Sequence, residues 1–240
     1  MYRILQTLSL LVIVLMSGIT VNAQEEGVGI TGKGIKFGAA WGSLSTNDDE
    51  FSPGSAGGFT AGVFLTYNFS PKLAIQPELL YVAKGAGDEG FLSGAGYNLG
   101  YVEVPVLLKY TPSSNRRLIP SVYLGPAVSV LTSAEIYYHG FFTSYEYDVK
   151  DGMKNLDFNM VFGGEIAFRS TRSAKFVLDV RYSIGLVNAI DPVEWNASRN
   201  AAEEEGDWGP FHWTREDRPM VAEDAYIKNR VFSFMLGLKF

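Results

Sequence analysis

The chain has 240 residues, of which 47% are hydrophobic and 14% aromatic, so it is long and apolar enough to bury a sizeable core in one domain. It contains no cysteine, which excludes a disulfide scaffold, a zinc-thiolate site and a lipidated N-terminal cysteine. Acidic side chains outnumber basic ones by 26 to 20, a net charge of −6, so nucleic acid is excluded as a partner on electrostatic grounds.

Residues 1–23 have the three parts of a secretory signal peptide. Arg3 supplies the positive charge, an apolar run is centred on Leu8 to Met16, and Val21-Asn22-Ala23 is a small-residue cleavage pattern. A membrane anchor is the alternative, but the unbroken run is shorter than the ~20 residues that a spanning helix needs. We predict cleavage after Ala23, which leaves a lead-in at 24–32 and a net charge of −7, because Arg3 is lost.

After the lead-in, hydrophobic residues recur at every second position, which is the pattern of strands with one apolar face. This alternation predicts roughly eight strands separated by turn residues. The predicted strands span 33–41, 58–69, 72–84, 97–110, 118–131, 156–169, 175–187 and 228–240.

The two faces of these strands differ in kind. One face is lined with large apolar residues, such as Ile35, Phe37 and Trp41 in the first strand. The other face mixes charged residues with glycine and alanine, and in YVEVPVLLKY it places Glu103 and Lys109 within an otherwise apolar strand. Either the apolar face points inward, as in a soluble lipocalin-like barrel, or it contacts lipid and the polar face lines a lumen.

Side-chain size decides between these two arrangements. A closed barrel of about eight strands has an interior only just wide enough for side chains, which suits glycine, alanine and paired charges. The bulky face would overfill that interior but suits hydrocarbon, and lipid tolerates no open strand edge. We therefore predict an all-β fold, a closed antiparallel eight-stranded transmembrane β-barrel of outer-membrane type, with Glu103 and Lys109 facing the lumen.

Connection lengths support this fold independently. Long segments at 42–57, 85–96, 132–155 and 188–227 alternate with short ones at 70–71, 111–117 and 170–174. Outer-membrane barrels place the short turns and both termini in the periplasm and the long loops outside. We predict that the barrel spans 33–240 and lies in the cell outer membrane, surrounded by outer-membrane lipid.

Four segments, YVEVPVLLKYTP, YLGPAVSV, FVLDVRYSIGL and the ending VFSFMLGLKF, resemble the PorT-like outer-membrane β-barrel proteins of Bacteroidetes, also labelled porin family. The likeness covers nearly the whole chain after the signal peptide. It implies a barrel and, as in some family members, a place in a secretion and gliding apparatus, but it transfers no catalytic or ligand residue. The terminal Phe240 is similar to the C-terminal signal recognised by barrel-assembly machinery, which is therefore an expected partner.

Charged residues on the predicted inner face are expected to form a network that plugs and rigidifies the lumen, because buried charges need partners. Glu78 and Glu103 lie on consecutive strands, and a hairpin centred near Phe91 brings them close to cross-strand register. Either Arg181, Lys36 or Lys109 must then lie nearby, or one of the two acids must have a raised pKa. A gated ion or proton path is one alternative, and a glycosidase-like acid pair, which would lack a substrate cleft, is another. The predicted network comprises Lys36, Glu78, Glu103, Lys109, Glu165, Asp179 and Arg181.

Motifs for cofactor, metal or catalytic sites are weak. GAGDEG at 85–90 matches G-x-G-x-x-G after a strand, but no helix pattern follows and two acids stand where phosphate would approach, so we interpret it as a loop. His139 and His212 are the only histidines, and neither has the spacing of a metal site or a triad. We predict no cofactor, no metal and no catalytic residue.

Aromatic residues gather in the third and fourth predicted outer loops. Tyr138 belongs to a predicted hairpin around His139-Gly140 that prolongs two strands above the membrane. Trp195, Trp208 and Trp213 are candidates for binding sugars, a partner protein or a divalent cation. The alternative is that these rings only pack the loop against itself and the barrel rim.

These features predict a non-enzymatic outer-membrane protein with a structural or interaction role in the cell envelope, whose outer loops engage an envelope partner within a secretion complex of the PorT-like kind. A narrow transport barrel that passes ions or small solutes is the first alternative. It predicts a conductance that changes on Glu103→Gln. An enzyme at the outer rim is the second alternative, on class membership alone.

Overall fold

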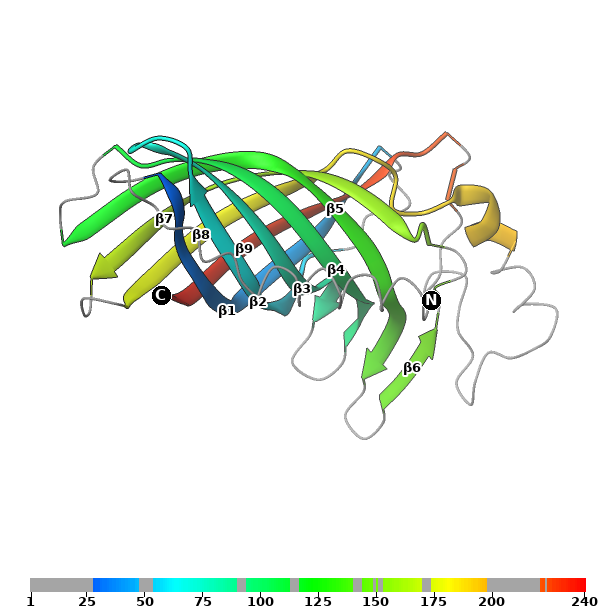
Figure 1. Cartoon of the computed structure of the whole chain (residues 1–240). Helices are drawn as coiled ribbons and strands as arrows, with labels where there is room; N and C mark the ends of the chain where they lie inside the picture. Colours follow the sequence, from blue (N-terminus) through cyan, green and yellow to red (C-terminus); the bar gives the residue numbers. More distant parts are fainter. Residues whose placement is uncertain are drawn as a thin grey trace.

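The computed structural model describes residues 28–47, 54–89, 94–112, 117–139, 144–148, 150, 153–169, 174–197, 221–222 and 224–240. Across these residues, nine β-strands form one antiparallel sheet (Figure 1). The strands are β1 (Gly29–Thr46), β2 (Ala56–Asn68), β3 (Leu73–Glu89), β4 (Gly94–Tyr110), β5 (Leu118–His139), β6 (Ser144–Asp148), β7 (Leu156–Arg169), β8 (Lys175–Gly185) and β9 (Ile227–Lys239).

A short helix covers residues 192–197, beyond the end of β8. In the part of the chain that the structure describes, no helix has the length and apolarity needed to cross a membrane. The predicted signal peptide and its cleavage after Ala23 lie outside the described residues.

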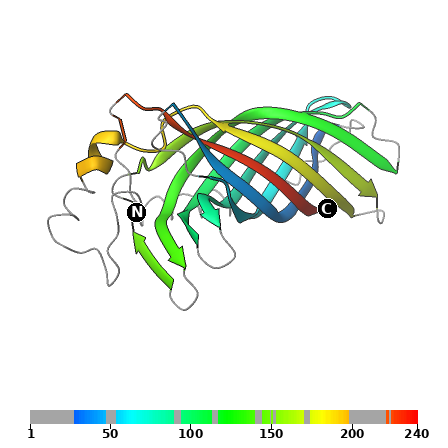
Figure 2. The ribbon, with the colours of Figure 1, turned by 180° about the vertical axis from the view of Figure 1, so that it is seen from behind.

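Eight of the strands close into a barrel. Neighbouring strands follow the order β4-β3-β2-β1-β9-β8-β7-β5, and a further pairing of β4 with β5 joins the two ends of this series. The last strand, β9, lies between β1 and β8, as Figure 2 shows from behind. Closure gives hydrogen-bond partners to the backbone N–H and C=O groups at the strand edges, which hydrocarbon cannot supply. The predicted closed eight-stranded antiparallel barrel is confirmed.

The ninth strand, β6, stands outside the barrel wall. It pairs with residues Glu135 to His139, the far end of β5, whereas the first part of β5 pairs with β7. β5 and β6 therefore form a hairpin that extends past the barrel at the end opposite the C-terminus (Figure 1). The predicted hairpin around His139-Gly140 is confirmed, since its last pair joins His139 to Ser144.

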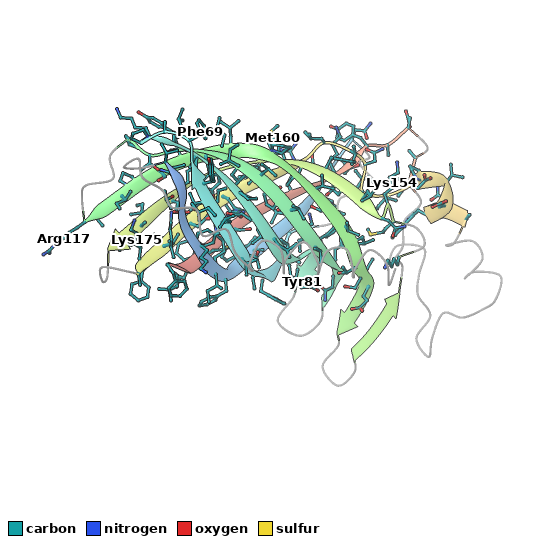
Figure 3. All side chains as sticks on the ribbon, viewed as in Figure 1. Phe69, Tyr81, Arg117, Lys154, Met160 and Lys175 are labelled. Carbon is teal, nitrogen blue, oxygen red and sulfur yellow. The ribbon has the colours of Figure 1, made fainter. Side chains whose placement is uncertain are left out.

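Alternate side chains of the barrel strands face opposite sides of the wall. Phe37, Val122 and Phe176 on the outer face are 57% to 61% exposed. Lys36 and Asp179, which face the lumen, are 1% and 0% exposed. Side chains project outward all along the wall, and the labelled Phe69 and Met160 are among them (Figure 3). The predicted assignment of the apolar face to the outside is confirmed on the barrel strands.

Strands extend further into the predicted outer loops than the sequence pattern indicated. β1 continues to Thr46, β3 continues to Glu89, and β5 continues to His139. The loops predicted at 42–57, 85–96 and 132–155 are therefore too long. The reason is that apolar alternation is required only where one face meets hydrocarbon, whereas the backbone ladder can continue into water.

The GAGDEG segment illustrates this error. Its interpretation as a loop is wrong, because Gly85 to Glu89 pair residue by residue with Asn98 to Gly94 of the next strand. Glycine and acidic residues disfavour strands, yet hairpin pairing overrides that weak local preference. The reasons given against a dinucleotide site are unaffected.

The two ends of the barrel are distinct. One end holds the short connections 69–72, 111–117 and 170–174, together with the start of β1 and the end of β9. In outer-membrane barrels this end faces the periplasm, so we refer to it as the periplasmic end. The other, outer end holds the long connections and the β5–β6 hairpin.

Candidate functional site: the charged lumen and its two ends

The centre of the lumen holds four buried charged side chains, Lys36 of β1, Glu78 of β3, and Asp179 and Arg181 of β8. The Lys36 ammonium lies 2.8 Å from a Glu78 oxygen and 2.6 Å from an Asp179 oxygen. The Arg181 guanidinium contacts the same two carboxylates at 2.8 Å and 2.7 Å. Two cations therefore share two carboxylates, and this central cluster joins β1, β3 and β8 across the lumen.

Burial explains why the charges of the central cluster occur together. Each ion loses its hydration when it enters the lumen, a penalty of several kcal/mol per ion, so it needs close partners of opposite sign. Charge-assisted hydrogen bonds at these distances are the strong kind, and the guanidinium of Arg181 is a planar donor that reaches both Glu78 and Asp179. The cluster is held by mutual neutralisation, and removing one member leaves the others short of a partner.

Aromatic rings complete the central cluster. Tyr123 of β5 donates its hydroxyl hydrogen to Asp179, and the Arg181 guanidinium lies 5.5 Å from the centre of the Tyr123 ring. Gly163 makes room for this ring, because a Cβ there would lie 2.6 Å from the Tyr123 hydroxyl oxygen. On the opposite side, the Lys36 ammonium lies 4.8 Å from the centre of the Phe64 ring, a cation–π distance.

A second ion pair extends the network towards the periplasmic end. The Lys109 ammonium lies 2.5 Å from a Glu165 oxygen and donates a hydrogen bond of 3.2 Å to the Gln76 side-chain oxygen. Gln76 donates its amide to Glu78 at 2.8 Å. Polar contacts are therefore continuous from Glu165 through Gln76 to the central cluster.

Polar groups on the outer side of the central cluster form a separate set. Asp157 accepts a hydrogen bond of 2.7 Å from Asn229 and lies 3.7 Å from the Lys84 ammonium. That ammonium also lies 4.1 Å from the centre of the Tyr101 ring. Glu103 accepts a hydrogen bond of 2.8 Å from Ser129.

An apolar cluster, which we call the outer cap, covers the outer end of the lumen. Trp195, in the helix at 192–197, belongs to this cluster and is 0% exposed. The side chain of Asn196 exchanges two hydrogen bonds with the backbone of Val221, at 2.7 Å and 3.0 Å, and so ties the helix to that segment. The outer cap consists of Leu44, Leu99, Tyr101, Leu131, Ala134, Met153, Ile190, Trp195, Val221, Ala225 and Ile227.

A polar cavity, which we call the periplasmic cavity, occupies the opposite end. Its volume is about 340 Å³, and residues of the short turns form part of its rim. Figure 3 labels Lys175, one of its lining residues, at this end of the barrel. The lining comprises Thr31, Thr66, Asn68, Pro71, Ala74, Lys109, Thr111, Ile119, Ser121, Glu165, Ala167, Lys175 and Lys239.

Six of the seven residues predicted for the lumen network lie in the central cluster or in the Lys109–Glu165 pair. The seventh, Glu103, lies apart. The β3–β4 register places Leu80 opposite Glu103, so Glu78 is offset by two residues. The two glutamates are therefore close to cross-strand register, as predicted, but their partners differ: Glu78 contacts Lys36 and Arg181, and Glu103 contacts Ser129.

The predicted outer-loop residues have different outcomes. Trp195 is fully buried, so the prediction that its ring contacts a partner directly is wrong and the packing alternative applies to it. The Tyr138 backbone pairs with Tyr145 in the β5–β6 hairpin. Its side chain is not among the described parts of the structure. Trp208, Trp213 and His212 lie outside the described residues.

The terminal Phe240 has its side chain on the outer wall, 56% exposed. Its backbone exchanges two hydrogen bonds with Lys33, at 2.8 Å and 3.1 Å, which continue the pairing of β9 with β1. Its recognition by assembly machinery stays a prediction.

Sequence reasoning left Lys84, Asp157, Tyr123, Gln76 and Asn229 out of the network. All five occupy inward positions by the same alternation that identified the others, so strand parity would have found Lys84 and Asp157. Gln76, Tyr123 and Asn229 carry no full charge, so a network predicted from charged residues alone omits them. Among the residues that the structure describes, no group of three or more histidine, aspartate or glutamate side chains is arranged to hold a metal ion.

Comparison with known proteins identifies the family. The family model described as outer membrane protein beta-barrel domain matches residues 22–191. No curated protein matches the chain.

Solved barrels are similar at low identity. The outer membrane protein OprG from Pseudomonas aeruginosa is 14% identical, with a TM-score of 0.46, covering 89% of this chain and 98% of that one. Neisserial surface protein A is 11% identical, with a TM-score of 0.45 and coverage of 88% and 99%. Ail of Yersinia pestis is 13% identical, with a TM-score of 0.41 and coverage of 89% and 99%. Because the family match spans more than half of the chain, this protein belongs to the outer membrane protein beta-barrel domain family and lies in the outer membrane.

Proposed function

We propose that this protein is a non-enzymatic outer-membrane barrel that is closed to solutes and has a structural or interaction role in the cell envelope. The observation that carries the proposal is the filled lumen. Buried ion pairs from β1, β3 and β8 cross its centre, and the outer cap covers one end. The carboxylates at the centre are engaged by Lys36 and Arg181, which supports a bracing role over a catalytic one.

Passage of an ion through this lumen would require the central ion pairs to separate. Each separated charge would stay buried without a partner, at a cost of several kcal/mol. The narrow interior of an eight-stranded barrel leaves little room for water to replace the lost contacts. We therefore expect the central cluster to be a barrier to conduction even where the ends are open.

Planar-bilayer recording tests this barrier. The wild-type barrel is expected to give no unitary conductance. A variant in which Lys36, Glu78, Asp179 and Arg181 are all replaced by alanine is expected to leak if it inserts, and it serves as the positive control. Folding of both proteins is checked by their heat-modifiable migration on gels. Reproducible conductance steps from the wild type would contradict the proposal.

The interaction role is supported by the β5–β6 hairpin. This hairpin prolongs the wall beyond the barrel, and β6 pairs with β5 along one edge only among the described strands. An extended strand edge is a template for pairing with another chain. We propose that the hairpin and the fourth loop engage an envelope protein.

Affinity capture from native membranes tests this role. The bait is the whole protein, compared with a variant in which 137–146 is replaced by Asn-Gly, the preferred two-residue hairpin turn. Wild type is expected to retain a defined partner, and the shortened variant is expected to lose it while still folding. A second variant lacking 198–220 tests the contribution of the fourth loop. Equal capture by all three proteins would contradict the role of the outer segments.

The resemblance to PorT-like barrels supports a finer proposal, that this partner belongs to a secretion apparatus. Deleting the gene in the native organism is then expected to reduce the amount of secreted protein in the medium. Restoration by the wild type but not by the hairpin-shortened variant would link that effect to the outer end. Unchanged secretion would contradict the secretion role and leave the closed barrel in place.

Transport is the second candidate, and the periplasmic cavity is the observation that favours it. The cavity reaches Lys109 and Glu165, the lower members of the lumen network. A transport barrel predicts measurable wild-type conductance that changes on Glu165→Gln. The same bilayer recordings therefore distinguish the two candidates.

A further inference from the structure

Exposed aromatic rings mark a boundary on the outer wall near the outer end. Trp41 of β1 and Phe232 of β9 are directly opposite each other, with ring centres 5.9 Å apart, and are 47% and 42% exposed. Phe59 and Tyr81, on β2 and β3, form a second exposed pair at 5.6 Å. Outer-membrane barrels carry such rings where hydrocarbon meets the headgroups. The outer limit of the hydrocarbon therefore lies near these rings.

Two basic residues of β9 lie just beyond this boundary. β9 ends at the periplasmic end, so its outward positions read Lys228, Arg230 and Phe232 from the outer end towards the middle of the wall. Arg230 is exposed, and the partly exposed Lys228 has its ammonium 5.6 Å from the centre of the Tyr226 ring. Strand parity places both cations on the same face as Phe232, outside the lumen. Positive charge is therefore presented at the level of the headgroups.

β1 places a hydroxyl group beside each of these cations. The register sets Ser43 opposite Arg230 and Ser45 opposite Lys228, and both serines are partly exposed. Opposite residues on one face of a sheet have Cβ atoms about 4.5–5.5 Å apart, so each serine is a neighbour of its cation. β1, in blue, and β9, in red, lie side by side in Figure 2. We call Ser43, Ser45, Lys228 and Arg230 the rim patch.

The rim patch and the rings below it match the two parts of a phosphorylated lipid. A guanidinium donates two parallel hydrogen bonds to a phosphate, an ammonium adds a point charge, and serine hydroxyls donate further bonds. The Trp41–Phe232 pair adjoins the patch on the hydrocarbon side and offers an apolar surface to an acyl chain. A free anion would contact only the polar part. The arrangement therefore favours a lipid over a soluble phosphate.

We propose that the rim patch binds the phosphate of a phosphorylated lipid in the outer leaflet, with an acyl chain of that lipid lying on the Trp41–Phe232 pair. The site is on the outside of the wall, so the proposal goes beyond the closed-barrel function and does not depend on it.

Native mass spectrometry of the whole refolded barrel tests the site. The barrel, in a neutral maltoside detergent, is titrated with dioleoyl phosphatidic acid or, separately, with dioleoyl phosphatidylcholine, whose phosphate is masked by choline. The wild type is expected to bind one phosphatidic acid about tenfold more tightly than phosphatidylcholine. Arg230→Gln and Lys228→Gln are each expected to weaken phosphatidic acid binding about fivefold or more, since each removes a charge-assisted contact. Arg230→Lys should lose less, because it keeps the charge without the planar donor pair.

The matched control is Lys154→Gln, at an exposed lysine of the same end, labelled in Figure 3. Lys154 precedes β7, and β8 separates β7 from β9. The control is expected to change the affinity less than about twofold, since exposed charges at a distance are screened. An equal loss in Lys154→Gln would show a diffuse attraction and overturn the defined site. Equal binding of the two lipids by the wild type, or wild-type affinity in both Arg230→Gln and Lys228→Gln, would overturn it as well.

A second arm separates a lipid from a soluble anion with the same phosphate chemistry. Inorganic phosphate in large excess is expected to leave phosphatidic acid bound, because it makes no contact with the rings. Trp41→Ala, which keeps the rim patch, is expected to weaken binding of phosphatidic acid. Folding of every variant is checked by its heat-modifiable migration on gels. Displacement of the lipid by inorganic phosphate, or wild-type affinity in Trp41→Ala, would overturn the assignment to a lipid.

Discussion

The outer and periplasmic ends of the lumen are lined by different kinds of residue. The outer cap is apolar and includes residues that the outer connections bring back over the barrel, with Trp195 and Ile190 among the most deeply buried. The periplasmic cavity is polar and is lined mainly by strand residues, with three lysines among them. The central cluster of ion pairs separates the two ends.

This difference shows that the two ends of one lumen, which face different aqueous compartments, can differ in polarity. The outer cap combines strand residues such as Tyr101 and Leu131 with residues of the outer connections such as Ile190 and Trp195. The periplasmic cavity depends on strand register, so it persists as long as the barrel is folded. The central cluster is the shared element, and we expect its loss to have the largest effect on stability.

Asp179→Ala is therefore expected to cause the largest loss. It leaves Lys36 and Arg181 with Glu78 as their remaining carboxylate, and uncompensated buried charge costs about 3–5 kcal/mol. Urea unfolding of the barrel in lipid vesicles measures this loss. Glu194→Gln, at an exposed carboxylate, is the control and should stay within about 0.5 kcal/mol. A loss below about 1 kcal/mol for Asp179→Ala would show that the cluster does not brace the barrel.

Trp195→Ala tests the outer cap. We expect a loss of about 3 kcal/mol, the low end of the range for removing a buried tryptophan, because the connecting segments can partly collapse into the space. Protease sensitivity near residues 190–197 should rise, while bilayer conductance should stay absent because the central cluster is intact. Val193→Ala, exposed in the same helix, should be neutral. Conductance gained by Trp195→Ala would place the barrier in the cap.

Tyr123→Phe tests the support of the central cluster at smaller scale. It removes the hydroxyl that donates to Asp179, and a hydrogen bond to a charged group contributes about 1.5–3 kcal/mol. The control is Tyr182→Phe, on the outer wall, which should change the free energy of unfolding by less than about 0.5 kcal/mol. Equal effects of the two substitutions would contradict a specific role for the Tyr123 hydroxyl.

Lys239→Gln is expected to have the smallest effect on stability. Lys239 is directly opposite Lys175 on the neighbouring strand, and like charges in that position repel, so stability should be unchanged or rise by up to about 0.5 kcal/mol. At the other end, Lys84→Gln removes a cation beside Asp157 and should destabilise the barrel. If both lysine substitutions destabilise equally, the contrast between the two ends does not hold.

The sequence predicted the wall of the barrel well, because strand geometry is local. Side chains alternate with a period of two, so the apolar neighbours Ile35 and Phe37 place Lys36 on the opposite face whatever the rest of the fold does. It predicted the ends of strands poorly. Beyond the hydrocarbon neither face must be apolar, and Gly85 to Glu89 pair without the signal that marked the earlier part of β3.

The pairings inside the lumen could not be predicted from the sequence in the same way. Lys36 and Asp179 are 143 residues apart in the chain, and they meet because closure sets β8 two strands away from β1. Glu78 and Glu103 are within two residues of cross-strand register, yet each glutamate has different partners, which the sequence pattern did not indicate. Strand stagger around a closed barrel is a property of the whole sheet and has no local signature.

The sequence by itself therefore determined which side of each strand meets lipid, and with it the closed barrel and its charged interior, since hydrocarbon requires one apolar face and leaves no strand edge unpaired. Only the tertiary structure decided which charges neutralise each other, that Trp195 belongs to an apolar cap, and that three lysines line a cavity at the other end. The physical reason is that these contacts depend on register and on the return of long connections over the barrel.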